Sequence, residues 1–453
     1  MRQSGPMRPL PSPAGSPPAG SPVPAASPPP PPAAPSPASS RPAPSPPPGS
    51  SVVRPAIVYA LLFGAVAAYI PYISVFLRST GLELGTVGLL IALQATVTLV
   101  AAPTWGALAD GLGDVRGPIL VAALLAAGAA TLLAVVNGPL AIAAAIVLLA
   151  ASTAGIIPMV DSRAVRLVGQ RHRFGRARAW GSAAFIVVAF ASGAAIGRFG
   201  PGGMFVLYGP MLVATGIAAY VLLRLPGDDR PGRARGNRRS TIGRGTGAAF
   251  SAFSVSTIVG AIRQPVIGRF FVGSVVVWTA FATLQTFVSL RVVQLGGDAT
   301  VIGATWSGSA LTEIPLMLAF PELARRFGAE RLVVVGAISF GMRAAIVAVV
   351  SSPWLVVAAS PFAGIGFAFF YVGTVTWVAG ALPRDVQATA QGVFTGTAVS
   401  IGSIGGSIIG GLIAGAFSLP VLFGVAAAGH VVGAIVVWQA IGRRGSAAPT
   451  RPG

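Results

Sequence analysis

Cysteine and lysine are both absent from this chain of 453 residues, and charged residues of any kind are scarce. Without cysteine there can be no disulfide framework and no thiolate-based zinc or iron–sulfur site. Only 9% of the residues are charged, against about 25% in an ordinary soluble domain, and 54% are hydrophobic. These shortages predict a protein that crosses a lipid bilayer many times.

Side-chain sets for catalysis are missing as well. The two histidines, His172 and His430, have no second metal ligand near them in the sequence. No Ser–His–Asp set, zinc motif or phosphate-binding loop occurs. We therefore expect no enzyme activity, no metal and no cofactor.

The net charge of +20 comes entirely from arginine. So basic a chain could suggest a nucleic-acid partner, but the arginines fall between hydrophobic runs. That distribution is typical of cytoplasmic loops in a membrane protein. The charge therefore predicts topology, and we expect no nucleic acid among the partners.

The first 51 residues cannot form a core. They contain 20 prolines and no acidic or aromatic residue, which predicts a disordered, partly polyproline tail. The tail lacks the apolar stretch of a signal peptide, so we expect the first span to remain in the mature protein. The proline runs could bind a partner, or the tail could be inert.

Twelve apolar runs of about 20 residues follow, the length that a bilayer core requires. The runs are continuously apolar rather than alternating, which predicts helices and not a β-barrel. The expected limits are Pro55–Leu77, Gly85–Leu108, Gly117–Val136, Pro139–Val160, Arg178–Gly197, Gly203–Leu223, Val266–Leu290, Thr300–Phe320, Leu332–Val350, Pro353–Leu382, Ala388–Ala416 and Pro420–Ile441.

An Arg/Gly-rich break divides the twelve spans into two sets of six. We expect a disordered tail over 1–51, a six-helix bundle over 52–224, a cytoplasmic linker over 225–264, a second bundle over 265–443 and a disordered tail over 444–453. Placing both termini in the cytoplasm puts 27 of the 31 arginines in inside segments. The reverse orientation would break the positive-inside rule at nearly every loop.

A short repeat supports the division. Leucine and alanine, two residues, an apolar residue and glycine, two residues, and arginine occur after the second span and again after the eighth. The first copy runs over 108–116 and the second over 323–331, an offset of 215 residues. Parallel six-helix repeats are the architecture of major facilitator transporters, whose halves rock about a site near the bilayer midplane.

The segment 106–116, Gly-Ala-Leu-Ala-Asp-Gly-Leu-Gly-Asp-Val-Arg, resembles the signature loop of major facilitator transporters. The resemblance implies a gating role for Gly106, Asp110, Gly113 and Arg116. The alternative is a solvated turn without such a role.

A narrower resemblance begins at Phe174–Ser182, which is similar to the fifth-helix motif of the lactose permease and phenylpropionate-transporter-like groups. It implies that Asp161 and Arg178 form a substrate-binding pair, with Phe185 in the place of a sugar-stacking tryptophan. On the residues alone, the pair could equally be interfacial and structural.

The second half resembles the same groups through 313–317 and Arg343. The histidine and glutamate that handle the proton in the lactose permease correspond here to Ala363 and Gly366, which can do neither job. The resemblance therefore fits the phenylpropionate-type group better than a galactoside permease.

Glu313 is the only acidic residue expected deep inside a span, where a carboxylate costs several kcal/mol. At 1.5 Å per residue, Glu313 lies roughly 12 Å and Arg343 roughly 17 Å from the cytoplasmic ends of their spans. These matched depths predict that the two face one another, with Glu313 carrying a proton and Arg343 as its charge partner or as an anchor for a substrate carboxylate. The alternative is a static buried salt bridge that fixes helix packing.

Aromatic residues at i,i+4 spacing could form the walls of a substrate pocket. The pairs are Tyr59 with Phe63 and Phe367 with Tyr371. Altogether we expect a monomeric multi-pass protein of the bacterial plasma membrane that imports a small organic solute with protons: an aromatic or carboxylic acid, a sugar or a nucleoside. Drug–proton antiport is the alternative within transport, and a non-transporting receptor is the alternative of another class.

Overall fold

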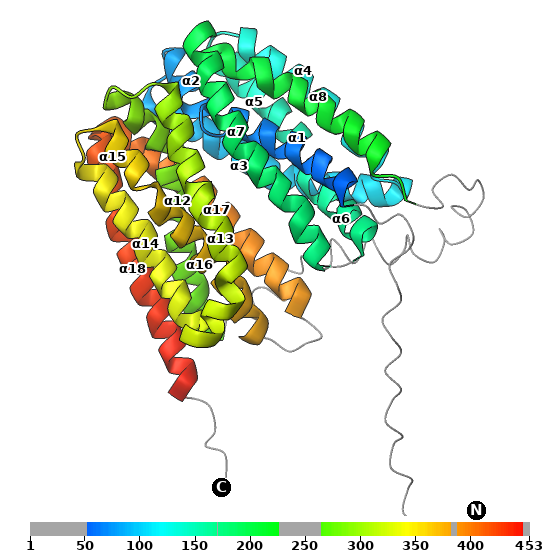
Figure 1. Ribbon diagram of the computed structural model, residues 1–453. Coiled ribbons are helices and arrows are strands. Elements are labelled where there is room, and N and C mark those ends of the chain that lie inside the picture. The colour runs from blue at the N-terminus through cyan, green and yellow to red at the C-terminus, as the bar shows by residue number, and fades with distance from the viewer. Residues whose placement is uncertain (1–51, 170, 226–263, 382–386, 447–453) are drawn as a thin grey trace, which may run out of the picture. The chain divides into compact units, whose positions relative to one another are not determined.

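The computed structural model of the protein describes residues 52–169, 171–225, 264–381 and 387–446 (Figure 1). Over these residues every regular element is a helix, and none is a strand. The all-α class is therefore confirmed. The tail predicted over 1–51 lies outside the described residues, as do nearly all of the linker 225–264 and most of the tail 444–453.

The helices follow the predicted spans closely. In the first half they are α1 Val53–Tyr69, α2 Ile73–Ser79, α3 Leu84–Leu112, α4 Arg116–Val135, α5 Pro139–Thr153, α6 Ile156–Val168, α7 Arg171–Phe199, the 3₁₀ turn η1 Pro201–Gly203, and α8 Met204–Leu222. In the second half they are α12 Pro265–Gln294, α13 Ala299–Phe327, α14 Ala329–Val349, α15 Pro353–Ala358, α16 Ser360–Ala381, α17 Gln387–Ala416 and α18 Leu419–Ser446.

Three predicted spans are each broken into two helices. The breaks between α1 and α2, α5 and α6, and α15 and α16 lie within four residues of Pro71, Pro158 and Pro361. A proline ring has no N–H to donate and clashes with the carbonyl four residues earlier, so the helix yields there.

Eleven of the described helical segments are long and apolar enough to cross a membrane. The eighth predicted span corresponds to α13, which is 29 residues long but is not among the eleven. This helix contains Glu313, two internal prolines and two arginines in its last turn. The protein is thus an integral multi-pass membrane protein, while the count of twelve spans stays a prediction.

Two pairs of glycines with positive φ reproduce the repeat offset of 215 residues. Gly113 (φ 71°) and Gly328 (φ 85°) end α3 and α13, where the sequence repeat was found. Gly81 (φ 86°) and Gly296 (φ 82°) precede the same two helices and form a second pair that sequence inspection missed. A backbone at positive φ favours glycine, which has no Cβ. Both halves therefore turn their chain in the same way before and after the second span.

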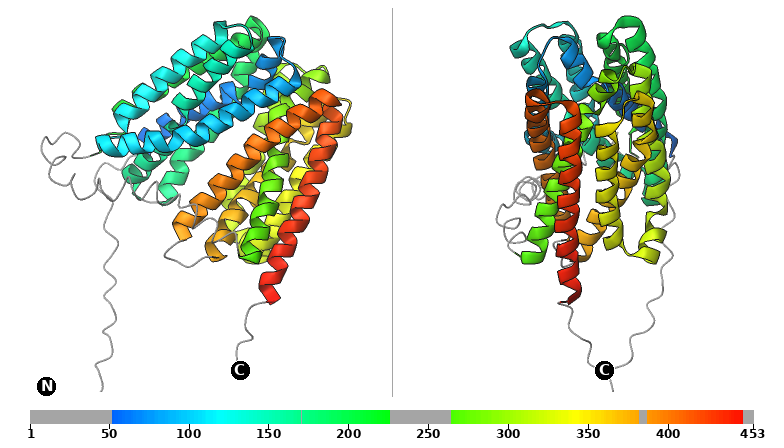
Figure 2. Two further views of the ribbon diagram at one scale, coloured as in Figure 1. Left: turned by 180° about the vertical axis from the view of Figure 1, so that it is seen from behind. Right: turned by 90° about the vertical axis from the view of Figure 1, so that its left-hand side faces the viewer.

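Two interfaces join the halves. α3 packs along α17 and α7 packs along α13; these are called here the α3–α17 seam and the α7–α13 seam. Figure 2 shows α3 and α17 side by side from behind. Apart from the seams, helices α1–α8 pack mainly on one another, and α12–α18 do the same.

Glycines permit close backbone approach at both seams. A Cβ on Gly88 of α3 would lie 2.4 Å from the carbonyl oxygen of Ser407 on α17. A Cβ on Gly303 of α13 would lie 2.9 Å from the carbonyl oxygen of Ala189 on α7. Gly88 and Gly303 are themselves 215 residues apart, so the two seams are equivalent under the internal repeat.

Tyr72 reinforces the α7–α13 seam from the connection between α1 and α2. Its hydroxyl lies 2.6 Å from the carbonyl oxygen of Ala189 and 3.1 Å from that of Ala299, so it can donate to either half. In the described residues, every hydrogen bond and glycine contact between the halves lies where α3 and α13 begin and where α7 and α17 end. This is the predicted outer face, and it is closed.

Candidate functional site

A polar cluster joins three helices of the first half. Asp161 on α6 accepts hydrogen bonds from the Tyr59 hydroxyl of α1 at 2.6 Å and from Arg178 Nη1 of α7 at 3.0 and 3.1 Å. Gly169, at φ 64°, ends α6 and lets the chain turn back into α7. The structure thus brings together the three residues that were predicted separately as substrate contacts.

The Arg178–Asp161 pair is only partly shielded. The Arg178 side chain is 42% exposed and that of Asp161 is 31% exposed, so the pair lies at an accessible surface rather than in a sealed core. The Arg178 guanidinium also lies over the Phe63 ring, 5.2 Å from its centroid, and over the Tyr59 ring at 6.0 Å. Such cation–π contacts fix the orientation of the guanidinium.

The predicted aromatic wall of the first half is present, with one exception. The rings of Tyr59 and Phe63 lie 6.2 Å apart, and Phe174 meets Tyr59 edge-on at 6.0 Å. Phe185 lies two turns beyond Arg178 on α7 and is half-buried, but it makes no ring or cation–π contact in the described part of the chain.

Glu313 lies in the second half, half-buried on α13. This helix packs against α7 and α16, and Arg178 is close enough for its charge to act on the Glu313 carboxylate. Among the described residues, no basic group lies within the 4.0 Å of an ion pair with Glu313. The cation nearest in effect to Glu313 is thus Arg178 of the opposite half.

The expected pairing of Glu313 with Arg343 is wrong for this conformation. Arg343 instead donates from Nη1 to Gln285 Oε1 of α12 at 3.4 Å. Depth arithmetic fixes the position along a helix but not the direction in which a side chain points. α13 and α14 contact each other little, and Gly364 of α16 packs against the α13 backbone at Glu313.

Aromatic side chains of three helices surround this part of the second half. The predicted pair on α16, Phe367 and Tyr371, is stacked with centroids 5.2 Å apart. Phe281 of α12 lies 6.1 Å from Phe367 and 4.6 Å from Phe340 of α14. Sequence spacing predicted the α16 pair, but it could not show that α12 and α14 add rings to the same cluster.

The predicted gating loop is anchored by a different acid. Gly113 takes the positive φ expected of a tight turn, but Asp110 is exposed and makes no hydrogen bond to a described residue. Asp114 instead accepts from Arg116 Nε at 2.9 Å and lies 3.9 Å from Arg163 Nη2 of α6. Sequence inspection placed Asp114 in the loop without assigning it a role.

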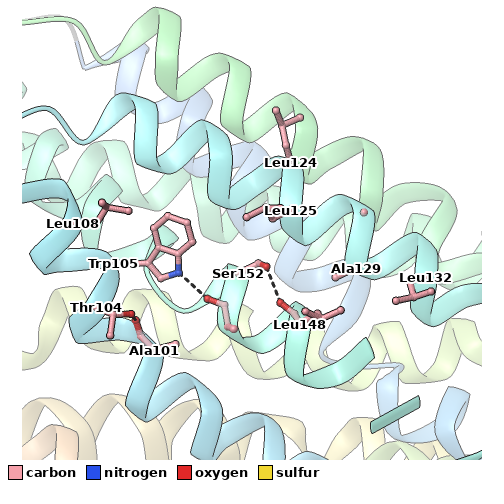
Figure 3. A pocket seen from close by; sticks show the side chains of 12 residues that line it. Ala101, Thr104, Trp105, Leu108, Leu124, Leu125, Ala129, Leu132, Leu148 and Ser152 are labelled. Carbon is pink, nitrogen blue, oxygen red and sulfur yellow. Dashed lines mark hydrogen bonds between the residues drawn. The ribbon is translucent and has the colours of Figure 1, made fainter. Parts of the chain in front are cut away.

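A separate pocket of about 660 Å³ lies between α3, α4 and α5 (Figure 3). Its lining is apolar except for Thr104, Trp105 and Ser152. All three donate to backbone carbonyls nearby, so none is free to hold a polar ligand. Within the described residues, moreover, no group of three or more metal-ligating side chains occurs.

Two inter-half seams, polar residues within the bundles and glycine-bounded repeats are the features of a rocking transporter, and comparison with known proteins agrees. The MFS_1 like family matches residues 52–425. The chain belongs to this family of major facilitator transporters. The resemblance drawn from the signature loop and the repeat is therefore confirmed at the level of the superfamily.

Individual relatives extend over most of the chain. The maltose permease of Geobacillus stearothermophilus is 26% identical over 357 residues, covering 78% of this chain and 86% of the permease. The uncharacterized transporter YwbF of Bacillus subtilis (strain 168) is 24% identical over 381 residues, covering 81% and 88%. The crystal structure of the nucleoside transporter NupG superposes with a TM-score of 0.73 at 15% identity, covering 86% of this chain and 98% of NupG. These relatives are transporters and not enzymes.

Proposed function

We propose that the protein is a proton-coupled secondary transporter that imports a small organic solute by alternating access across the bacterial plasma membrane. It works as a monomer with twelve spans in two halves and with both termini in the cytoplasm. Glu313 carries the proton, while Asp161, Arg178 and the neighbouring rings contribute to substrate binding.

The observation that carries this proposal is the position of Glu313 relative to Arg178. Glu313 belongs to α13 and Arg178 to α7, so a charge on Glu313 acts across the boundary between the halves. Arg178 is at present paired with Asp161 of its own half. Two carboxylates on different halves therefore compete for one guanidinium.

This competition couples protonation to rocking. When Glu313 is ionised, its attraction to Arg178 draws the halves together on the predicted cytoplasmic side. Protonation of Glu313 removes that attraction and permits the conformation described here, which is closed at the predicted outer face. A proton taken up outside would thus be released inside, in the direction of symport. An ionisable group within a membrane span is expected to serve such a relay.

Proteoliposomes with an imposed pH gradient test the role of Glu313. The Glu313→Gln variant should lose gradient-driven accumulation of substrate but keep substrate exchange at zero gradient, because only the proton-linked step is removed. Glu322→Gln is the matched control, since Glu322 lies on the same helix but is exposed and paired with Arg325. Full accumulation by the Glu313 variant would disprove the proton role. Accumulation driven by an outward-directed process in the wild type would instead favour drug–proton antiport.

A further inference from the structure

Arg343 is a buried cation without an acidic partner. Its side chain lies in the middle of α14 and is 2% exposed. The contact of 3.4 Å between Nη1 and Gln285 Oε1 is its only hydrogen bond to a described residue, and Nε is enclosed with no partner at all. No carboxylate of the described chain lies within 4.0 Å. A guanidinium taken out of water without a counter-charge is costly, and the fold itself does not compensate it.

The surroundings of this cation are flat and apolar. One turn before Gln285 on α12 lies Phe281, and one turn before Arg343 on α14 lies Phe340; their rings are 4.6 Å apart. Phe367 and Tyr371 of α16 continue the surface. Arg343 and Phe340 are buried, whereas Gln285, Phe281, Phe367 and Tyr371 are half-buried. The accessible layer is therefore aromatic, with one amide, and the positive charge lies behind it.

We propose that this site binds an aromatic monocarboxylate, whose carboxylate is held by Arg343 and Gln285 and whose ring packs on Phe281, Phe367 and Tyr371. The inference names the substrate class of the transporter and rests on the proposed function. Guanidinium is the preferred protein partner of a carboxylate, and offset or edge-on ring contacts suit an aryl group.

Other substrate classes fit these side chains less well. A cationic drug would be repelled by Arg343. A sugar or nucleoside would need several hydrogen-bonding groups close together, but most of the half-buried side chains here are phenyl rings. Hydrogen bonds to a charged group are also the ones whose loss costs most, so charge should dominate selection at this site.

Isothermal titration calorimetry on the purified full-length chain tests the inference with matched probes. 1-Naphthoate and 1-naphthamide share the ring and differ in charge, while acetate and chloride are anions without a ring. We expect naphthoate to bind roughly tenfold more tightly than naphthamide or better, the factor that one charge-assisted hydrogen bond supplies. Acetate and chloride should bind at least tenfold more weakly than naphthoate.

Two substitutions locate the selectivity. Arg343→Gln should abolish the preference for naphthoate over naphthamide, and Arg343→Lys should keep part of it. Gln285→Glu supplies an internal carboxylate within reach of Arg343, so it should block naphthoate while raising the melting temperature. This second variant decides the matter even if Arg343→Gln fails to fold, because a purely structural Arg343 would tolerate it without change in binding. Arg325→Gln is the control, since that side chain is 77% exposed on α13.

Each other outcome overturns the inference. Equal binding of naphthoate and naphthamide, or binding of neither, refutes a carboxylate site. Chloride or acetate binding as tightly as naphthoate refutes the aromatic part. Undiminished naphthoate binding by Gln285→Glu removes Arg343 from the site.

Failure of the inference can be told apart from failure of the proposed function. Binding is measured without a gradient, so a carboxylate site could be confirmed in a protein that proves not to be proton-coupled. Conversely, pH-driven accumulation of a neutral solute in proteoliposomes would uphold the transport function and refute the substrate class.

Discussion

Replacing Gly88 with alanine should shift the protein away from the conformation described here and toward one that is open at the predicted outer face. The added Cβ would lie 2.4 Å from the Ser407 carbonyl oxygen and 2.8 Å from the Cα atom of Gly411. Both neighbours are backbone atoms of α17, so no side-chain rotation can relieve the overlap. The α3–α17 seam must part instead.

The size of the effect follows from the cost of overpacking. An extra methyl group in a close-packed interface costs about 1–3 kcal/mol, which changes a conformational equilibrium by roughly 5- to 150-fold. A conformation that is favoured several-fold in the wild type would thus become the minor one.

The absence of cysteine makes the measurement simple, because introduced cysteines are the only thiols. Spin labels at Glu83→Cys, just before α3, and at Phe417→Cys, just after α17, report the separation of the two helix ends by double electron–electron resonance. Both side chains are exposed, Phe417 by 73%. In the Gly88 variant the distance distribution should move to longer values.

A glycine inside one half provides the control. A Cβ on Gly216 of α8 would lie 2.8 Å from the Ala123 Cβ of α4, within the first half. Gly216→Ala should therefore lower the thermal stability without changing the distance between the labels. An unchanged distribution in the Gly88 variant would show that the seam tolerates the methyl group and would refute this account of the closed face.

Two further substitutions separate function from stability. Asp161→Asn removes the charge that holds Arg178; because both side chains are partly exposed, it should cost less than about 1 kcal/mol of stability but reduce substrate counterflow by roughly tenfold or more, the loss of one charge-assisted contact. A normal counterflow rate would make the pair structural. Arg291→Met should act in the opposite way, since this buried guanidinium donates to carbonyls at the end of α14. Unsatisfied carbonyls should lower the unfolding free energy by about 1–3 kcal/mol, seen as a lower melting temperature with exchange retained at permissive temperature.

Hydropathy and glycine spacing predicted the helices well because a bilayer fixes both the length and the apolarity of a span. Most observed boundaries lie within a few residues of the expected ones. The breaks at Pro71, Pro158 and Pro361 were missed, because Pro103, Pro210, Pro315 and Pro321 lie inside unbroken helices. Local sequence alone does not decide which proline interrupts its helix, since neighbouring helices can support a kinked one.

The site was predicted less completely. Periodicity gives the depth of a residue but not the rotation of its helix about its own axis, and so Glu313 was assigned to Arg343 rather than to the neighbourhood of Arg178. Tyr59 was expected only as a ring, yet its hydroxyl binds Asp161. Polar contacts between helices that are distant in sequence depend on packing, which composition does not encode.

The equivalence of Gly88 and Gly303 under the 215-residue repeat has a thermodynamic consequence. Because the seams lie on either side of one pseudo-twofold axis, rigid halves cannot part at α3–α17 while remaining in contact at α7–α13. The two interfaces therefore open as a single cooperative unit. The free-energy penalties of bulky residues at Gly88 and at Gly303 should not add, because once the first residue has separated the halves, the second meets nothing. Duplication has given the protein two latches that can be released by opening either one.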